Sequence, residues 1–258
     1  MKICILGAGK MGTWLTDALC LQHQVAIYDP NLERLRFVFN TERLTKPEEV
    51  GEFQPELLIN AANLQHTIPA FESVMEYLPR DCIISDIASV KSGLKEFYEN
   101  SGKRFVSTHP MFGPTFGSLK ELKQHHAIVI SESDHMGKTF FKDFFGSLGL
   151  NLHEYSFEEH DQTIAYSLSV PFSSTLVFAA CMKKQDAPGT TFRKHHEIAR
   201  GLLSEDDYLL TEILMNPFTV GQVEKIRKEL KHLLELIENK DTEGLQAFLK
   251  KVRKNIRE

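Results

Sequence analysis

Two short segments carry side chains with the chemistry of a proton transfer. Ser89 lies in "DIASVKSG", residues 86–93, and His109 lies in "STHPMFGP", residues 107–114. Each segment follows an apolar run that predicts a strand, and Pro110 disfavours a helical conformation for His109. A hydroxyl and an imidazole at neighbouring strand ends can share a hydrogen bond, so Ser89 would orient His109, which would accept a proton. The alternatives are a structural histidine and a serine that caps the following helix.

A glycine-rich motif near the N-terminus lies between an expected strand at residues 2–6 and a segment with helical spacing. The residues of this "GAGKMG" motif that matter here are Gly7, Gly9, Lys10, Met11 and Gly12. Gly7 would permit a tight turn, Gly9 would let a pyrophosphate approach the backbone, and Gly12 would let the helix pack against the strand. The first turn of that helix would donate its N–H groups to the phosphates.

The acidic residue that ends the next expected strand bears on the choice of dinucleotide. Asp29 would accept hydrogen bonds from the adenine ribose hydroxyls, and its charge would repel a 2′-phosphate. NAD is therefore the predicted cofactor. Arg34 and Arg36 follow closely, so NADP is the alternative. The purely structural interpretation is a glycine-rich turn with a core aspartate.

The rest of the chain predicts two domains. Apolar strand-like runs alternate with helical runs up to about residue 154, which is typical of βαβ units and a mostly parallel sheet. From residue 155 the pattern is helical, and a run that starts near Val220 carries one broad apolar stripe. We therefore expect an α/β fold with an N-terminal dinucleotide-binding (Rossmann) domain over 1–154 and an all-α domain over 155–258. Part of the stripe could pack on a second subunit.

Composition is that of an ordinary globular protein. The chain has 258 residues, 42% hydrophobic and 25% charged, with a net charge of −5, so neither a nucleic acid nor a membrane is an expected partner. No run approaches the ~18 apolar residues of a membrane span, and the N-terminus lacks the features of a signal peptide. The four cysteines have no metal-ligand or redox spacing. Cys4 and Cys82 lie in apolar runs, so we expect buried thiols and a cytoplasmic location.

Taken together, these segments give the chain a resemblance to the prephenate dehydrogenase family, which includes arogenate and cyclohexadienyl dehydrogenases. The resemblance covers most of the chain and rests on "GAGKMG" with Asp29, "DIASVK", "THPMFGP" and "EEHDQTIA", in that order. It implies a dinucleotide domain and a helical domain that forms a homodimer. It also implies oxidative decarboxylation of prephenate to 4-hydroxyphenylpyruvate in tyrosine biosynthesis, with hydride transfer to NAD and no metal ion.

The resemblance implies roles for three residues near the expected strand ends. His109 matches the family histidine that takes the hydroxyl proton, and Ser89 matches the serine that hydrogen-bonds to it and to the substrate. His160 matches the histidine of the "EEHD" segment and is expected to line the substrate site. A helix-capping or domain-contact role for His160 is the alternative.

Two positions depart from the family pattern. The family arginine that binds the substrate carboxylate falls at Glu197, so Arg200 is expected to replace it through a two-pronged contact, with Arg193 as the second candidate. A surface or interface ion pair is the alternative for Arg200. A histidine that many relatives carry is Phe172 here, which leaves arogenate open as the substrate. The residues that could substitute for it are Ser169, Ser173 and His196.

Two other functions stay open. One is a different two-domain dehydrogenase that uses a lysine of the helical domain, although no such lysine stands out. The other is a nucleotide-binding regulatory protein without turnover. The presence of both Ser89 and His109 argues against that second function.

Overall fold

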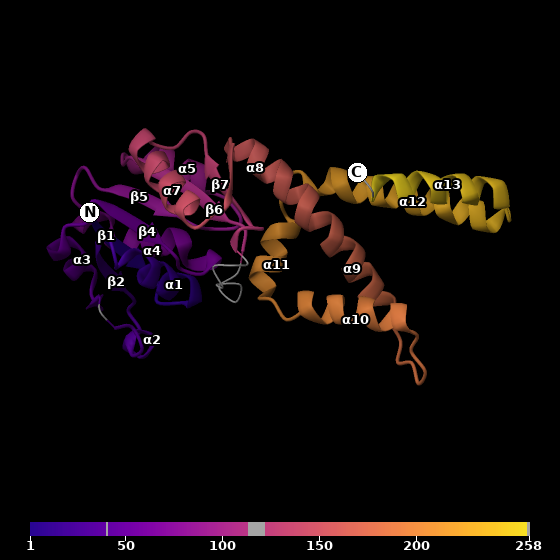
Figure 1. Cartoon of the computed structure of the whole chain (residues 1–258), viewed down its shortest axis with the longest axis horizontal. Helices are drawn as coiled ribbons and strands as arrows, with labels where there is room; N and C mark the ends of the chain where they lie inside the picture. Colours follow the sequence, from indigo (N-terminus) through magenta and orange to yellow (C-terminus); the bar gives the residue numbers. More distant parts are fainter. Residues whose placement is uncertain (40, 113–121, 257–258) are drawn as a thin grey trace. The chain divides into compact units, whose positions relative to one another are not determined.

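A computed structural model describes residues 1–39, 41–112 and 122–256. These residues form two compact units, Met1–Asp161 and Gln162–Glu258 (Figure 1). The first unit combines a sheet with helices, and the second is helical. The predicted α/β fold with a following all-α part is confirmed.

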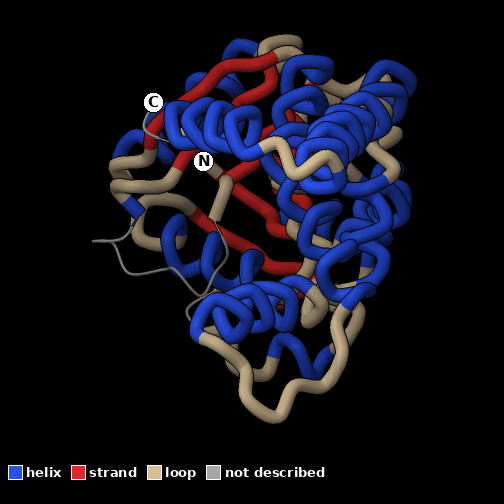
Figure 2. Tube along the Cα trace, turned by 90° about the vertical axis from the view of Figure 1, so that its right-hand side faces the viewer, coloured by secondary structure: helices blue, strands red, loops and turns tan. Residues whose placement is uncertain are grey.

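The first unit is built on one sheet. Over the described residues its strands are β1 (Lys2–Leu6), β2 (Gln24–Tyr28), β3 (Glu42–Leu44), β4 (Leu57–Asn60), β5 (Ile83–Asp86), β6 (Phe105–Pro110), β7 (His126–Ile130) and β8 (Asn151–Tyr155). They lie in the order β3-β2-β1-β4-β5-β6-β7-β8. Every neighbouring pair is parallel except β6 and β7, so the prediction of a mostly parallel sheet holds. Figure 2 shows these strands in red among the blue helices.

Helices cover both faces of this sheet. Those of the first unit are α1 (Lys10–Leu19), α2 (Leu32–Leu35), α3 (Pro47–Phe53), α4 (Thr67–Val74), α5 (Leu94–Ser101) and α7 (His135–Ser147), with 3-10 turns η1 (Leu64–His66) and η2 (Met75–Tyr77). Buried residues of α1 and α7 share an apolar cluster with Ile3 and Ile5 of β1. Buried residues of α3, α4 and α5 share the opposite cluster with Cys4 and Leu6. Successive residues of β1 thus point to opposite faces, and both faces are apolar because both are covered.

The second unit continues from a helix that begins in the first. Its elements are α8 (Phe157–Ile164), the π-helical turn η4 (Ala165–Ser169), α9 (Val170–Cys181), α10 (Thr190–Leu202), α11 (Asp207–Leu214), α12 (Thr219–Glu238) and α13 (Thr242–Asn255). The Asp206 carboxylate accepts hydrogen bonds from two N–H groups at the start of α11, and the Asp241 carboxylate accepts one at the start of α13. These caps satisfy N–H groups that have no partner inside their own helices.

The first compact unit extends beyond the predicted boundary at residue 154. Phe157 is buried in the apolar cluster that covers one face of the sheet, and His160 contacts a residue of β6. The start of α8 therefore belongs to the sheet unit by its packing, although its helical pattern resembles the segments that follow. Cys4 and Cys82 are buried, as predicted.

One helical run exceeds the expectation from the sequence. Phe157–Cys181 contains an 18-residue window of mean hydropathy 1.5, of which 17% is buried, so it is long and apolar enough to cross a membrane by length and composition alone. The prediction that no segment approaches a membrane span is wrong for this run. A single such helix is weak evidence for a membrane span, because an apolar helix covered by other parts of a protein passes the same test.

Candidate active site

The glycine motif has the shape that close approach to a phosphate requires. Gly7 adopts a φ of +95°, and a Cβ on Gly12 would overlap the carbonyl oxygen of Gly7, so both positions need glycine. A Cβ on Gly9 would meet nothing within 4 Å, which leaves open space over the start of α1. Among the described residues no side chain caps that helix. Its first N–H groups and this open space fit a nucleotide phosphate. The contacts predicted for Lys10 and Met11 stay predictions.

Asp29 lies directly after β2 and is held by backbone groups. Its Oδ2 accepts a hydrogen bond from Ala8 N at 3.0 Å, and its Oδ1 accepts one from Asn31 N at 2.8 Å. Arg34 Nη1 lies 3.6 Å from Asp29 Oδ2, and the Arg34 side chain is 56% exposed. The carboxylate is therefore fixed next to the glycine motif, which it ties to the end of β2. Its predicted contact with a ribose stays a prediction.

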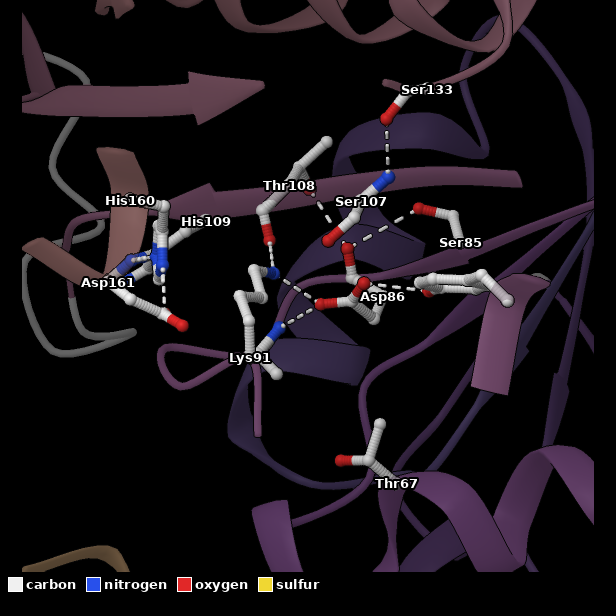
Figure 3. Close-up of polar contacts among 12 residues, drawn as sticks. Thr67, Ser85, Asp86, Lys91, Ser107, Thr108, His109, Ser133, His160 and Asp161 are labelled. Atoms are coloured by element: carbon white, nitrogen blue, oxygen red, sulfur yellow. Dashed lines mark hydrogen bonds and ion pairs between the residues drawn. The ribbon is translucent and has the colours of Figure 1, made fainter. Parts of the chain in front are cut away.

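His109 lies within β6, where it pairs with Ile128 of β7. We expected it just past the end of its strand, and that expectation is wrong because His109 is a residue of β6 and is only 6% exposed. Its Nδ1 lies 3.0 Å from Nε2 of His160 (Figure 3). Burial, reinforced by His160 and by the charge of Lys91, lowers the pKa of His109 well below its usual range. The imidazole is therefore neutral at pH 7 and can accept a proton.

His160 contacts His109 from α8. The side chain of His160 is fully buried, and its Nδ1 lies 3.1 Å from Oδ1 of Asp161. Burial lowers the pKa of His160, although the hydrogen bond to Asp161 opposes this shift. His160 lies inside α8 and bridges an imidazole and a carboxylate, so the capping alternative is not seen, and its predicted contact with substrate stays a prediction.

Ser89 lies just past the carboxyl end of β5, as predicted, but the described residues do not show its predicted hydrogen bond to His109. It is half-buried in the loop after β5. It does not cap α5 either, because that helix begins at Leu94 with Gly93 as its N-cap residue. His160 takes the position beside His109 that we expected for Ser89. A contact between Ser89 and the substrate stays a prediction.

A buried ion pair fixes the loop that carries Ser89. Asp86 and Lys91 have fully buried side chains and form a salt bridge, and Tyr98 donates its hydroxyl to Asp86 Oδ1 at 2.7 Å. Lys91 Nζ also donates to the carbonyl oxygen of Thr108 at 2.7 Å. The loop after β5 is thereby tied to β6 beside His109 (Figure 3).

Sequence reasoning assigned no role to three of these charged residues. They are Asp86, Lys91 and Asp161. The available signal was an aspartate and a lysine five positions apart within the apolar "DIASVK" segment, and an aspartate directly after the histidine in "EEHD".

The two arginines proposed for the substrate lie on α10, in the second unit. Arg193 and Arg200 are both exposed, and among the described residues neither forms an ion pair, so the alternative of a surface ion pair for Arg200 is not seen. Arg193 lines a pocket of about 380 Å³ together with Phe192 and His196. His109 belongs to the other unit, and the predicted roles of these arginines stay predictions.

The surroundings of Phe172 remove one of its expected substitutes. Phe172 is half-buried on α9. The Ser169 hydroxyl is buried and contacts the carbonyl oxygen of Ile213 at 3.0 Å and the hydroxyl of Thr219 at 2.8 Å. Ser169 therefore serves the packing of the helical unit. Ser173 and His196 stay open as substitutes for the family histidine.

Two remaining expectations concern the loop after His109 and metal ions. Pro110 and Gly113 were expected to help hold His109; Pro110 ends β6, and Gly113 lies outside the described residues. Across residues 1–39, 41–112 and 122–256, no group of three or more His, Cys, Asp or Glu side chains could hold a metal ion.

A known protein family matches the part of the chain that contains most of this site. The family of the nucleotide-binding domain of prephenate dehydrogenase matches residues 24–146. This range begins after the glycine motif, contains Ser89, Lys91 and His109, and ends before His160.

Two curated relatives extend the likeness along the chain. The probable arogenate/prephenate dehydrogenase of Methanocaldococcus jannaschii is 25% identical over 214 residues, which is 78% of this chain and 48% of that protein. The T-protein of Enterobacter agglomerans is 24% identical over 188 residues, which is 68% of this chain and 49% of that protein. The chain thus spans about half the length of the curated relatives it matches.

Solved structures share the fold over nearly the whole chain. Prephenate dehydrogenase from A. aeolicus, in complex with hydroxyphenyl propionate and NAD+, has a TM-score of 0.85 at 21% identity and covers 99% of this chain and 96% of its own. Synechocystis arogenate dehydrogenase has a TM-score of 0.79 at 17% identity, with 99% and 98% covered. At these identities the likeness establishes the fold.

Proposed function

Because this chain belongs to the prephenate dehydrogenase family, we propose that it oxidises and decarboxylates prephenate to 4-hydroxyphenylpyruvate with NAD as the hydride acceptor. The observation that carries this proposal is the buried imidazole of His109, which lies one residue before the end of β6 and is hydrogen-bonded to His160. It lies at the carboxyl-end edge of the sheet, the edge that also bears the glycine motif. In open α/β sheets, ligands bind at this edge.

The proposed reaction requires a base and groups that bind the anionic parts of the cofactor and the substrate. His109 accepts the proton of the ring hydroxyl, and the electron density left on oxygen helps to expel a hydride from the same carbon. Loss of CO2 then makes the ring aromatic and leaves a phenolate oxygen, which takes the proton back from His109 to give the phenol. A bound nicotinamide dinucleotide would supply the hydride acceptor. The glycine motif and the start of α1 would hold its phosphates, and Arg200 or Arg193 would hold a substrate carboxylate.

NAD is the proposed dinucleotide because a carboxylate ends β2. Asp29 is fixed by Ala8 N and Asn31 N, so its negative charge is held directly after β2, where it would repel a 2′-phosphate. Arg34 offsets part of that charge. A titration with NAD and with NADP, followed by quenching of Trp14 fluorescence, separates the two. Tighter binding of NADP would overturn this choice.

Arogenate is the second candidate substrate, and Phe172 is the observation that favours it. An apolar ring at this position cannot donate a hydrogen bond to the keto side chain of prephenate, which the histidine of many relatives could. Arogenate carries an amino group there instead. The reaction at the ring and the role of His109 are the same for both substrates.

We also propose a homodimer formed through the helical unit. Several large apolar side chains of α12 are exposed in the single chain, at Val220, Val223, Leu230, Leu234 and Ile237. A largely apolar pocket of about 570 Å³, lined in part by Leu230, Leu233 and Phe248, lies beside them. An exposed apolar surface of this kind marks a protein interface more often than a free surface.

The first experiment combines the purified protein with NAD and prephenate, and then with NAD and arogenate, and follows absorbance of the reduced nicotinamide. Turnover of either substrate supports the reaction and identifies the side chain it prefers. His109→Asn should lower kcat about 10²- to 10⁴-fold. The control is Asp143→Asn on α7, which is exposed and outside the site, and it should turn over normally. Binding of NAD without turnover of either substrate would favour a regulatory protein.

A further inference from the structure

Three side chains form a hydrogen-bonded chain from a buried position to a partly exposed one. His109 Nδ1 lies 3.0 Å from His160 Nε2, and His160 Nδ1 lies 3.1 Å from Asp161 Oδ1 (Figure 3). The His160 side chain is fully buried, whereas that of Asp161 is 24% exposed. The proton transfer described above uses only His109.

The Asp161 carboxylate, at one end of this series of hydrogen bonds, determines which nitrogen atoms of the two imidazoles carry protons. An ionised carboxylate only accepts hydrogen bonds, so Nδ1 of His160 must carry a proton and donate it to Asp161. Nε2 of neutral His160 is then an acceptor, and Nδ1 of His109 must donate to it. This leaves the lone pair of His109 on Nε2, which has no hydrogen-bond partner within the described part of the chain. A substrate hydroxyl can therefore meet an acceptor.

We propose that Asp161 and His160 are positioning residues that hold His109 in its proton-accepting tautomer and stabilise the positive charge it gains. The inference rests on the proposed dehydrogenase reaction. When the substrate O–H bond breaks, a bond forms between that proton and His109 Nε2. The imidazolium of His109 keeps its Nδ1 proton in the hydrogen bond to His160 Nε2, and the Asp161 carboxylate stabilises that positive charge through His160 until the Nε2 proton leaves the site.

The charges around the two imidazoles indicate that Asp161 is the counter-charge for a protonated His109. Lys91 carries a positive charge in the same buried region and opposes a second one on His109. Asp86 is engaged by Lys91 and by the hydroxyl of Tyr98, so its charge is already balanced. Among the described residues, the Asp161 carboxylate forms a hydrogen bond to this pair of imidazoles, with its Oδ1 at 3.1 Å from Nδ1 of His160. A cation in a buried site requires such a counter-charge.

The kinetic test is Asp161→Asn with Asp143→Asn as the matched control. Both changes remove one negative charge from the sheet unit, and Asp143 is exposed on α7. Asp161→Asn should lower kcat at least about 10²-fold with little change in KM or in NAD affinity. The acid limb of its kcat profile should move to lower pH, since losing the carboxylate disfavours imidazolium. Asp161→Glu should recover part of kcat. Equal losses in Asp161→Asn and Asp143→Asn would overturn the inference.

A second readout does not depend on turnover. Nitrogen-15 NMR of labelled protein distinguishes the two neutral tautomers of an imidazole, and His109→Asn identifies the signals of His109. The expected result is a proton on Nδ1 of His109 in the unaltered protein and a mixture of tautomers in Asp161→Asn. A proton on Nε2 in the unaltered protein would refute the proposed positioning. If neither prephenate nor arogenate is turned over, the proposed function fails, and the NMR result still decides between the tautomers.

Discussion

His109 and His160 are two imidazoles whose burial favours the neutral form. Burial is the largest cause of the lowered pKa of each, and Lys91 adds to the effect on both. A neutral imidazole is the form that accepts a proton, so the burial that makes these residues costly to charge also prepares His109 for its proposed role. The same property couples the stability of the fold to pH.

We expect the free energy of unfolding to fall as the pH decreases below about 6.5, the usual pKa of histidine. In the unfolded chain both imidazoles bind protons below that pH, whereas in the folded chain they do so only at lower pH. Stability therefore rises with pH across this window. Urea unfolding between about pH 5 and pH 7 measures the slope. His109→Asn removes one of the two groups and should give a shallower slope. An unchanged slope would show that His109 is ordinarily protonated in the fold.

Removing one partner of the buried ion pair of Asp86 and Lys91 should lower the free energy of unfolding much more than replacing both residues with uncharged ones. Lys91→Met leaves the Asp86 carboxylate buried without its cation, which should destabilise the protein by about 3–5 kcal/mol. The double variant Asp86→Asn with Lys91→Met should recover part of this loss. Urea unfolding of the single and double variants measures the coupling. Lys231→Met serves as the control, because Lys231 is 76% exposed in its pair with Glu235. A double variant less stable than Lys91→Met would contradict the argument.

At the scale of elements, the glycine motif offers two changes with different expected effects. Gly12→Ala places a Cβ against the carbonyl oxygen of Gly7, so α1 must shift, at a cost of about 1–3 kcal/mol. Gly9→Ala places a Cβ in open space and should leave stability nearly unchanged, while it obstructs the approach of a phosphate. Thermal unfolding and NAD titration measure the two quantities. Normal NAD affinity in Gly9→Ala would place the dinucleotide elsewhere.

Elements with a strong local pattern were predicted from the sequence. The strands β1 and β2, the helix α1 and the position of Asp29 agree with the structure because each has a pattern complete within a few residues. The strand β3 and the helices α2 and α3 were missed. Two of the three residues of β3 are exposed and charged, and α2 has four residues. Such short elements depend on their neighbours for stability more than on their own sequence.

The relation of Ser89 to His109 could not be read from the sequence in the same way. The path of the loop after β5 depends on the contacts of Lys91 with Asp86 and Thr108, which join residues from two strands. The contact of His109 with His160 joins positions 51 residues apart. The type of residue in each motif was therefore predictable, but the partner that each one meets was not.

At the scale of the whole molecule, the exposed apolar residues of α12 predict self-association. Sedimentation velocity should show a dimer, and Leu230→Asp with Leu234→Asp should shift it to monomer, because charge is costly to bury at an interface. Lys228→Asp introduces an aspartate on the same helix without removing an apolar side chain, and it should leave the dimer intact. Monomeric behaviour of the unaltered chain at all concentrations would refute the proposed assembly.

The π-helical turn at Ala165–Ser169 determines how α9 is rotated about its own axis. One extra residue in a turn rotates every later side chain by about 100° about the helix axis, since an α-helix has 3.6 residues per turn. Deleting a single residue there would turn Phe172 and its neighbours on α9 to a different face without changing any of their identities. The direction in which the side chains of α9 point therefore depends on the number of residues in the π-helical turn, which is five.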